Sequence, residues 1–175
     1  MKQKPIHIII TGGTIDSHYD GTKDTVVPNK ESILPEYMKM LRLYRKVAFT
    51  NICMKDSRSL NTSDRAKVLK TVIESPYKNI VITHGTYTMP DTARFISKKI
   101  DGGGSKNDKV IILTGSMIPL VGFSPSDAGF NLGFAFGQFN SLAPGVYVAM
   151  NGEIFSPDEV VKLLSQGRFS SILNK

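Results

Sequence analysis

Short runs of apolar, mostly β-branched residues alternate with longer amphipathic stretches along the chain. The apolar runs predict strands at residues 6–11, 47–54, 79–83, 109–114 and 145–150. The amphipathic stretches predict helices at residues 32–44, 62–74, 90–100, 127–139 and 157–164. This alternation is typical of an α/β fold, in which a mostly parallel central sheet is flanked by helices on both faces. We therefore expect a single three-layer domain over residues 1–175.

The length and composition narrow the class of protein. A chain of 175 residues suits one domain, and its single cysteine, Cys53, excludes a disulfide framework or a cysteine-rich zinc site. No apolar run approaches the roughly 20 residues of a membrane helix. The apolar stretch behind the basic N-terminus covers only residues 6–10, too few for the core of a signal peptide, so we expect a cytoplasmic location. Residues 102–105, rich in glycine, are expected to be the most flexible point.

The net charge of +7 raises the question of a nucleic-acid partner. The lysines and arginines are scattered over the predicted helices and loops, without a compact basic run interleaved with aromatic residues. We therefore expect neither a nucleic-acid nor a membrane partner. A mild positive field would instead attract a small anionic or zwitterionic substrate.

Polar residues follow four of the predicted strands, at the edge where ligands bind in sheets of this kind. Hydroxyls, backbone amides, a carboxylate and an amine meet there, which favours nucleophilic catalysis by a hydroxyl group. The paired glycines expose N–H groups between Gly12 and Thr14 that could stabilise an oxyanion. The alternative is that each threonine only caps the helix that follows it. The segments are Thr11-Gly12-Gly13-Thr14-Ile15, Asp56-Ser57-Arg58, His84-Gly85-Thr86-Tyr87-Thr88-Met89 and, after residues 150–152, the predicted helix with Lys162.

Two of these segments resemble the signatures of the bacterial-type L-asparaginases. Residues 11–15 are similar to the first signature, and residues 84–89 are similar to the second. Residues 113–117, 126–131 and 150–152, with Lys162, are similar to later stretches of that family, in the same order. The resemblance is to a short-chain form with the amino-terminal α/β domain alone, although truncation of a longer chain is a competing explanation. It implies a homo-oligomer, a dimer or tetramer, and no metal or organic cofactor.

The resemblance also implies roles for individual residues. Thr14 would be the nucleophile, and Tyr19, in a polar loop that could act as a lid, would help to activate it. Thr86 and Lys162 would form a second catalytic pair, with the lysine neutral when it accepts a proton. The alternative for Lys162 is an exposed helical cation paired with Asp158, one turn before it.

The remaining residues would bind the substrate. Gly13 and Gly85 belong to the two signatures, and Ser57 matches a serine that contacts the substrate's α-carboxylate. Asp56 departs from a commoner glycine, and Arg58 either adds a fork for the carboxylate or is solvated. Tyr87 stands where the family has an aspartate that helps to hold the α-amino group, so we expect altered recognition of that group.

The leading hypothesis is therefore an amidohydrolase that converts the side-chain amide of L-asparagine, or of a related amide, to a carboxylate and ammonia through a threonine acyl-enzyme. One alternative is a catalytically silent protein of the same fold that binds a small amino acid or amide. Another is the amidase component of a tRNA-dependent amidotransferase.

Overall fold

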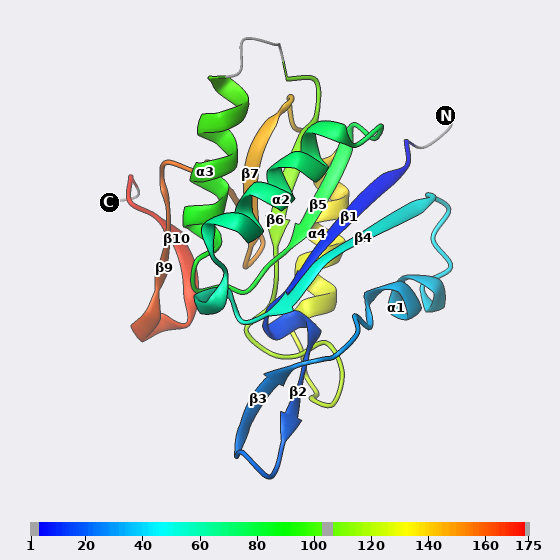
Figure 1. The fold of residues 1–175 in the computed structure, drawn as a ribbon, viewed down its shortest axis with the longest axis vertical. Helices are drawn as coiled ribbons and strands as arrows, with labels where there is room; N and C mark the ends of the chain where they lie inside the picture. Colours follow the sequence, from blue (N-terminus) through cyan, green and yellow to red (C-terminus); the bar gives the residue numbers. More distant parts are fainter. Residues whose placement is uncertain (1–3, 103–106, 174–175) are drawn as a thin grey trace.

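A six-stranded sheet forms the centre of the computed structural model, which describes residues 4–102 and 107–173 (Figure 1). The strand order is β4-β1-β5-β6-β7-β8, and the first five strands are parallel, whereas β8 runs antiparallel to β7. The strands are β1 (Ile6–Gly12), β4 (Val47–Lys55), β5 (Asn79–Thr83), β6 (Val110–Thr114), β7 (Gly145–Met150) and β8 (Glu153–Phe155). Of the expected flexible point, only Gly102 lies within the described residues.

Helices cover both faces of this sheet. Helices α2 (Thr62–Glu74) and α3 (Met89–Asp101) lie on one face, and α1 (Leu34–Met40) and α4 (Ala128–Gln138) lie on the other (Figure 1). Side chains of β1 alternate between two cores, with Ile9 in the α2–α3 core and Ile8 and Ile10 in the α1–α4 core. The predicted three-layer α/β fold is thus confirmed.

The first helix is shorter than the predicted span of residues 32–44. Pro35 occupies its first turn, where the missing N–H costs nothing, and the chain leaves the helix before Arg42, whose φ is +48°. Met40 is 67% exposed and Tyr44 is 99% exposed, so neither extends the buried stripe expected from the sequence. Helix α2, in contrast, has the predicted bounds and begins with a capping box between Asn61 and Asp64.

Two hairpins stand apart from the central sheet. One pairs β2 (Ser17–Asp20) with β3 (Thr25–Pro28), where the sequence predicted a loop. The other pairs β9 (Val160–Leu163) with β10 (Arg168–Ser171) through the 3-10 turn η3 (Leu164–Gln166). The helix predicted at residues 157–164 is therefore wrong.

The second hairpin forms because a short apolar run satisfies a strand as well as a helix. Val160 is fully buried, and its side chain joins the α2–α3 core together with Phe169 of β10. Since side chains two residues apart lie on one face of a strand, Lys162 projects from the same face as Val160. The alternative in which Lys162 lies one helical turn after Asp158 is therefore wrong, because this segment is a strand.

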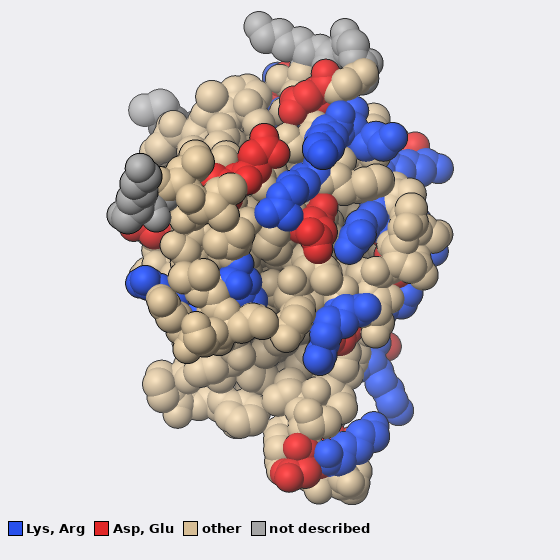
Figure 2. All heavy atoms as spheres, turned by 90° about the vertical axis from the view of Figure 1, so that its left-hand side faces the viewer, with Lys and Arg blue, Asp and Glu red and all other residues tan. Residues whose placement is uncertain are grey.

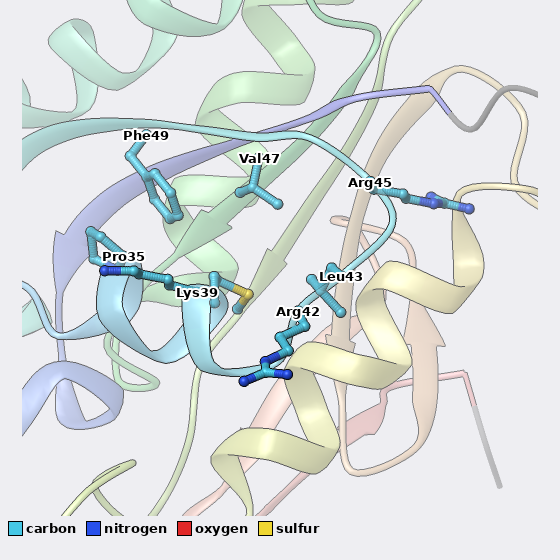
Figure 3. A pocket seen from close by; sticks show the side chains of 8 residues that line it. Pro35, Lys39, Arg42, Leu43, Arg45, Val47 and Phe49 are labelled. Atoms are coloured by element: carbon cyan, nitrogen blue, oxygen red, sulfur yellow. The ribbon is translucent and has the colours of Figure 1, made fainter.

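A hollow of about 300 Å³ lies between α1 and β4 (Figure 3). Pro35 and Lys39 come from the helix, and Val47 and Phe49 come from the strand. Arg45, from the connecting segment, points away from the others (Figure 3). None of the residues predicted to carry the chemistry lines this hollow, so its size does not mark the site.

The surface bears both signs of charge. On the side that carries α3 and the β9–β10 hairpin, lysines and arginines are interspersed with aspartates and glutamates (Figure 2). No helix in the part of the chain that the structure describes is long and apolar enough to cross a membrane.

Candidate active site

The carboxyl ends of β1, β4 and β5 meet the β9 hairpin around a cavity of about 140 Å³. All the sequence-predicted site residues except Tyr19 line this cavity, together with Met117, which was assigned no role from the sequence. The structure therefore brings together residues that are up to about 150 positions apart along the chain. The lining residues are Gly13, Thr14, Asp56, Ser57, Arg58, Gly85, Thr86, Tyr87, Met117 and Lys162.

Two glycines allow the strand ends to approach one another. Gly13 has a φ of +83°, and a Cβ atom there would lie 2.3 Å from the backbone nitrogen of Gly85. A Cβ atom on Gly85 would in turn lie 2.8 Å from the Cβ of Ser57. These approaches exclude a side chain at either position. Both glycines thus set the spacing of the loops that carry Thr14, Ser57 and Thr86.

Lys162 and Thr86 form a direct pair across the cavity. Lys162 Nζ donates a hydrogen bond of 2.6 Å to Thr86 Oγ1, and the threonine is only 5% exposed. Burial of the lysine lowers its pKa below the ordinary value of 10.5, and the positive charge of Arg58 lowers the pKa further. The Asp56 carboxylate opposes both effects. The two residues of the predicted pair are therefore in contact, and Lys162 reaches Thr86 from a strand rather than from a helix.

Arg58 and Asp56 form a two-pronged ion pair at the rim. Arg58 Nε and Nη2 each donate to a different oxygen of Asp56, at 3.0 Å. The backbone N–H of Arg58 also donates to Asp56, at 2.8 Å. These bonds hold the pKa of the Asp56 carboxyl below its ordinary value. Both carboxylate oxygens are consequently engaged by one neighbour.

Tyr87 lies close to both basic side chains of the site. Its ring centre is 5.2 Å from Arg58 Cζ and 5.1 Å from Lys162 Nζ, both within cation–π range. Half of the Tyr87 side chain remains exposed. The ring therefore contacts both basic side chains at the open side of the cavity.

Ser57 anchors the loop of the second signature. It is 2% exposed, and its Oγ accepts a hydrogen bond from the Thr88 backbone N–H at 3.3 Å. Its carbonyl oxygen accepts a bond of 2.8 Å from the Thr88 hydroxyl. The Ser57 hydroxyl hydrogen can still be donated, because a hydroxyl both donates and accepts.

Thr14 begins the 3-10 turn η1 (Thr14–Asp16) directly after β1 and lies against the cavity. The Gly13 N–H donates to the carbonyl oxygen of Lys55 at 2.9 Å, so this amide is engaged in the structure. The expectation that it could stabilise an oxyanion is therefore wrong for Gly13. Ser17 Oγ donates to the Gly13 carbonyl oxygen at 2.7 Å and fixes the turn from behind.

Tyr19 lies on β2, outside the set of residues that line the cavity. Its side chain is 50% exposed, and its hydroxyl donates to Asp24 Oδ1 at 2.5 Å within the same hairpin. The ring packs edge-on against Phe123. Participation of Tyr19 in the chemistry stays a prediction.

His84 positions the loop of the second signature. The side chain is fully buried; Nδ1 donates to the Gly85 carbonyl oxygen at 2.7 Å, and Nε2 lies 2.9 Å from Thr92 Oγ1. Burial lowers the pKa of His84 to about 4. The neutral ring therefore ties the second signature to helix α3.

An amide network holds Met117 and the lysine hairpin in place. Asn131 is 1% exposed; its Nδ2 donates to the Gly115 carbonyl oxygen at 3.0 Å, and its Oδ1 accepts from the Asn151 N–H at 3.2 Å. Asn151 Oδ1 accepts a bond of 2.9 Å from the N–H of Phe169, which faces Lys162 across the hairpin. The later stretches singled out in the sequence thus connect β6 and β7 to the lysine.

The described residues include no group of three or more histidine, cysteine, aspartate or glutamate side chains placed to hold a metal ion.

Comparison with known proteins identifies the family. Residues 5–172 match the family model described as "Asparaginase, N-terminal". The chain belongs to the asparaginase family. Among curated members of related sequence, one subunit of the glutamyl-tRNA(Gln) amidotransferase of Methanococcus vannielii is 31% identical over 94% of this chain and 37% of its own length. An L-asparaginase of Thermococcus kodakarensis is 34% identical over 70% of this chain and 36% of its own.

Solved structures support the same assignment over nearly the whole chain. The thermostable L-asparaginase from Thermococcus kodakarensis matches 98% of this chain with a TM-score of 0.82 and 29% identity, and 52% of that protein is covered. A probable cytoplasmic L-asparaginase from Campylobacter jejuni matches 97% of this chain with a TM-score of 0.75 and 31% identity, again over 52% of its own length. The chain thus spans about half of these solved relatives and just over a third of the curated ones.

Proposed function

We propose that this protein hydrolyses the side-chain amide of L-asparagine or of a related short amide, releasing ammonia and a carboxylate. The observation that carries the proposal is the hydrogen bond between Lys162 and Thr86 in a cavity that also exposes Thr14. A hydroxyl needs a neighbouring base or amine to act as a nucleophile or to activate water. The pair supplies that amine, and membership of the asparaginase family supports the reaction class.

The proposed reaction has two halves. The Thr14 oxygen attacks the amide carbon, the C–N bond breaks, and ammonia leaves with the proton given up by the hydroxyl. Water then hydrolyses the resulting ester to a carboxylate and restores the Thr14 hydroxyl. Because the Gly13 amide is engaged, the N–H of Thr14 is the donor of this turn that would serve the developing oxyanion.

Lys162 would take part in its neutral form. An ammonium has no lone pair for a proton, so its pKa must lie well below that of a solvated lysine. Burial and the charge of Arg58 both act in that direction. Thr86, hydrogen bonded to the amine, would relay the proton to or from the reacting group.

A second candidate is the amidase role suggested by the Methanococcus relatives that are named as a subunit of glutamyl-tRNA(Gln) amidotransferases. An amidase of this kind would require a partner protein before it released ammonia from glutamine. The third candidate, a silent protein that binds an amide, is favoured by one feature of the site, which is the phenol of Tyr87 beside the lysine.

The expected homo-oligomer, a dimer or tetramer, and a cytoplasmic location are also part of the proposal. Sedimentation velocity of the purified protein tests the assembly, since a monomer at all concentrations would contradict it. No metal or organic cofactor is proposed, so dialysis against a chelator is expected to leave the rate unchanged.

The proposal is tested by ammonia release from L-asparagine, L-glutamine and short amides without an α-amino group. Thr14→Ala serves as the blank, and it should abolish release while a bound ligand still raises the melting temperature. Release that needs an added partner protein would favour the amidotransferase role. Binding without any release by the parent protein would favour the silent protein.

A further inference from the structure

The cavity is lined by more basic than acidic side chains. Among the described residues around it, Asp56 is the one acid, whereas Arg58 and Lys162 are both basic. Arg58 engages both oxygens of Asp56, through Nε and Nη2, and its backbone N–H adds a third bond. The acid is therefore already neutralised by the site's own cation, and the charge of Lys162 is left over whenever the lysine is protonated.

A substrate ammonium would have no free carboxylate to face here. It would instead meet the Arg58 guanidinium and the Lys162 amine, whose Cζ and Nζ atoms lie 5.2 and 5.1 Å from the centre of the Tyr87 ring. Burying a cation without a counter-ion is unfavourable, and like charges add to that cost. The phenol of Tyr87 can accept a hydrogen bond, but it does not take the place of a carboxylate as a counter-ion.

A substrate carboxylate fits the same surroundings. The charge of protonated Lys162, which the acid of the site does not balance, attracts it, and the buried Ser57 hydroxyl has a hydrogen to donate. The cavity volume of about 140 Å³ lies well below the roughly 300–1,000 Å³ of pockets for drug-sized ligands. The volume therefore suits a ligand with a short carbon chain.

From these observations we infer that the preferred substrate is a short carboxylic acid with a terminal amide and no ammonium group, of which succinamate is the simplest example. The inference rests on the proposed function for the hydrolysis step, but the choice between ligands depends on binding alone. Hydrolysis of succinamate by the steps above yields ammonia and succinate. L-asparagine carries the same amide and carboxylate and differs only by the α-ammonium.

The test compares binding of succinamate and L-asparagine to Thr14→Ala by calorimetry, so that turnover does not enter. Succinamate is expected to bind at least tenfold more tightly, and the parent protein should show a preference of similar size in kcat/KM. Binding of L-asparagine that equals or exceeds that of succinamate would overturn the inference, whether or not ammonia is released. Absence of release alongside the expected binding preference would instead count against the proposed hydrolysis only.

Two further substitutions, each made in the Thr14→Ala background, test the physical reason. Arg58→Gln frees Asp56 to face an ammonium, and Tyr87→Asp places a new carboxylate beside the same position. Each should reduce the preference for succinamate at least threefold. Tyr87→Phe is the matched control, since it keeps the ring and should leave the preference unchanged. A preference for succinamate that is unchanged in both Arg58→Gln and Tyr87→Asp would contradict the electrostatic explanation.

Discussion

Replacing Arg58 by glutamine should move the pH dependence of the reaction. The arginine lowers the pKa of Lys162 by repulsion, whereas the charge of Asp56 raises that pKa in the parent protein and remains in the variant. The substitution therefore removes the charge that lowers the pKa and leaves the one that raises it. The pKa of Lys162 rises, and a higher pH is needed to produce the neutral amine.

The structure gives the size of this effect. Each charge lies about 5 Å from the Tyr87 ring centre, so the two are separated by no more than about 10 Å. The Arg58 side chain is 65% exposed, so solvent screening is strong and an effective dielectric constant of roughly 40–80 applies. The repulsion is then at least about 0.4–0.8 kcal/mol, or about 0.3–0.6 pH unit. We therefore expect the limb of the pH profile that reports Lys162 to move by roughly 0.3–0.6 pH unit.

The assay is the pH profile of kcat/KM, which reports the free enzyme. Its rising limb should move to higher pH in Arg58→Gln by the amount given above. The double variant Asp56→Asn/Arg58→Gln removes both opposing charges and should shift the limb by less than the single variant. Both side chains are partly exposed, so the melting temperature should change little. A limb that stays in place, or moves to lower pH, in the single variant would refute the role given to Lys162.

Three other substitutions test the site and its support. Lys162→Met keeps the apolar stem but removes the amine, and it should lower kcat by roughly 10²–10⁴-fold with little change in melting temperature. A rate close to that of the parent would show that Lys162 has no part in catalysis. Asn151→Ala removes the hydrogen bond to the Phe169 N–H and should loosen the hairpin that carries Lys162. We therefore expect kcat to fall more than KM rises. An effect on KM alone would contradict a role of Asn151 in positioning Lys162. His84 is neutral when folded, with a pKa of about 4, so the unfolded chain binds more protons between that value and about 6.5. The free energy of unfolding, measured by urea denaturation at several pH values, should therefore rise by roughly 2–3 kcal/mol across this interval. In His84→Gln the free energy of unfolding should rise less steeply with pH. The same dependence on pH in the variant as in the parent would contradict the buried neutral ring.

The central sheet could be predicted because its strands are continuous apolar runs. Residues 79–83 and 145–150 were predicted with their observed bounds, and the carboxyl ends of the parallel strands do bring the signature residues together. Residues with a special backbone requirement were also informative, since Gly13 and Gly85 lie where adjacent loops nearly touch. These features depend on local pattern and on the general geometry of parallel sheets.

The last segment could not be predicted from its pattern. The segment of residues 157–164 has apolar side chains at a spacing that fits a short helix or one strand. In the structure the strand is stabilised by packing of Val160 and Phe169 in the core. Pairing with β10 requires residues beyond the segment itself, including Gly167 with a φ of +60°. The lysine reaches Thr86 because of this long-range pairing.

The hydrogen bonds of the polar side chains also could not be predicted from the sequence. Spacing of two residues does not reveal that Arg58 engages both oxygens of Asp56, nor that the Gly13 amide is already used by Lys55. Met117 has no chemical signature in the sequence, yet it lines the cavity, and its backbone N–H donates to the two carboxylate oxygens of Asp127 at 2.9 and 3.1 Å. Such details depend on the three-dimensional arrangement of several loops.

The most direct test of the account is to locate the acyl group during turnover. The protein would be mixed with succinamate, quenched in acid and digested, and the peptides that carry Thr14 and Thr86 examined by mass spectrometry. The account predicts a succinyl ester on the Thr14 peptide and none on that peptide from Thr14→Ala. Ammonia release with the acyl group on Thr86, or persisting undiminished in Thr14→Ala, would contradict it.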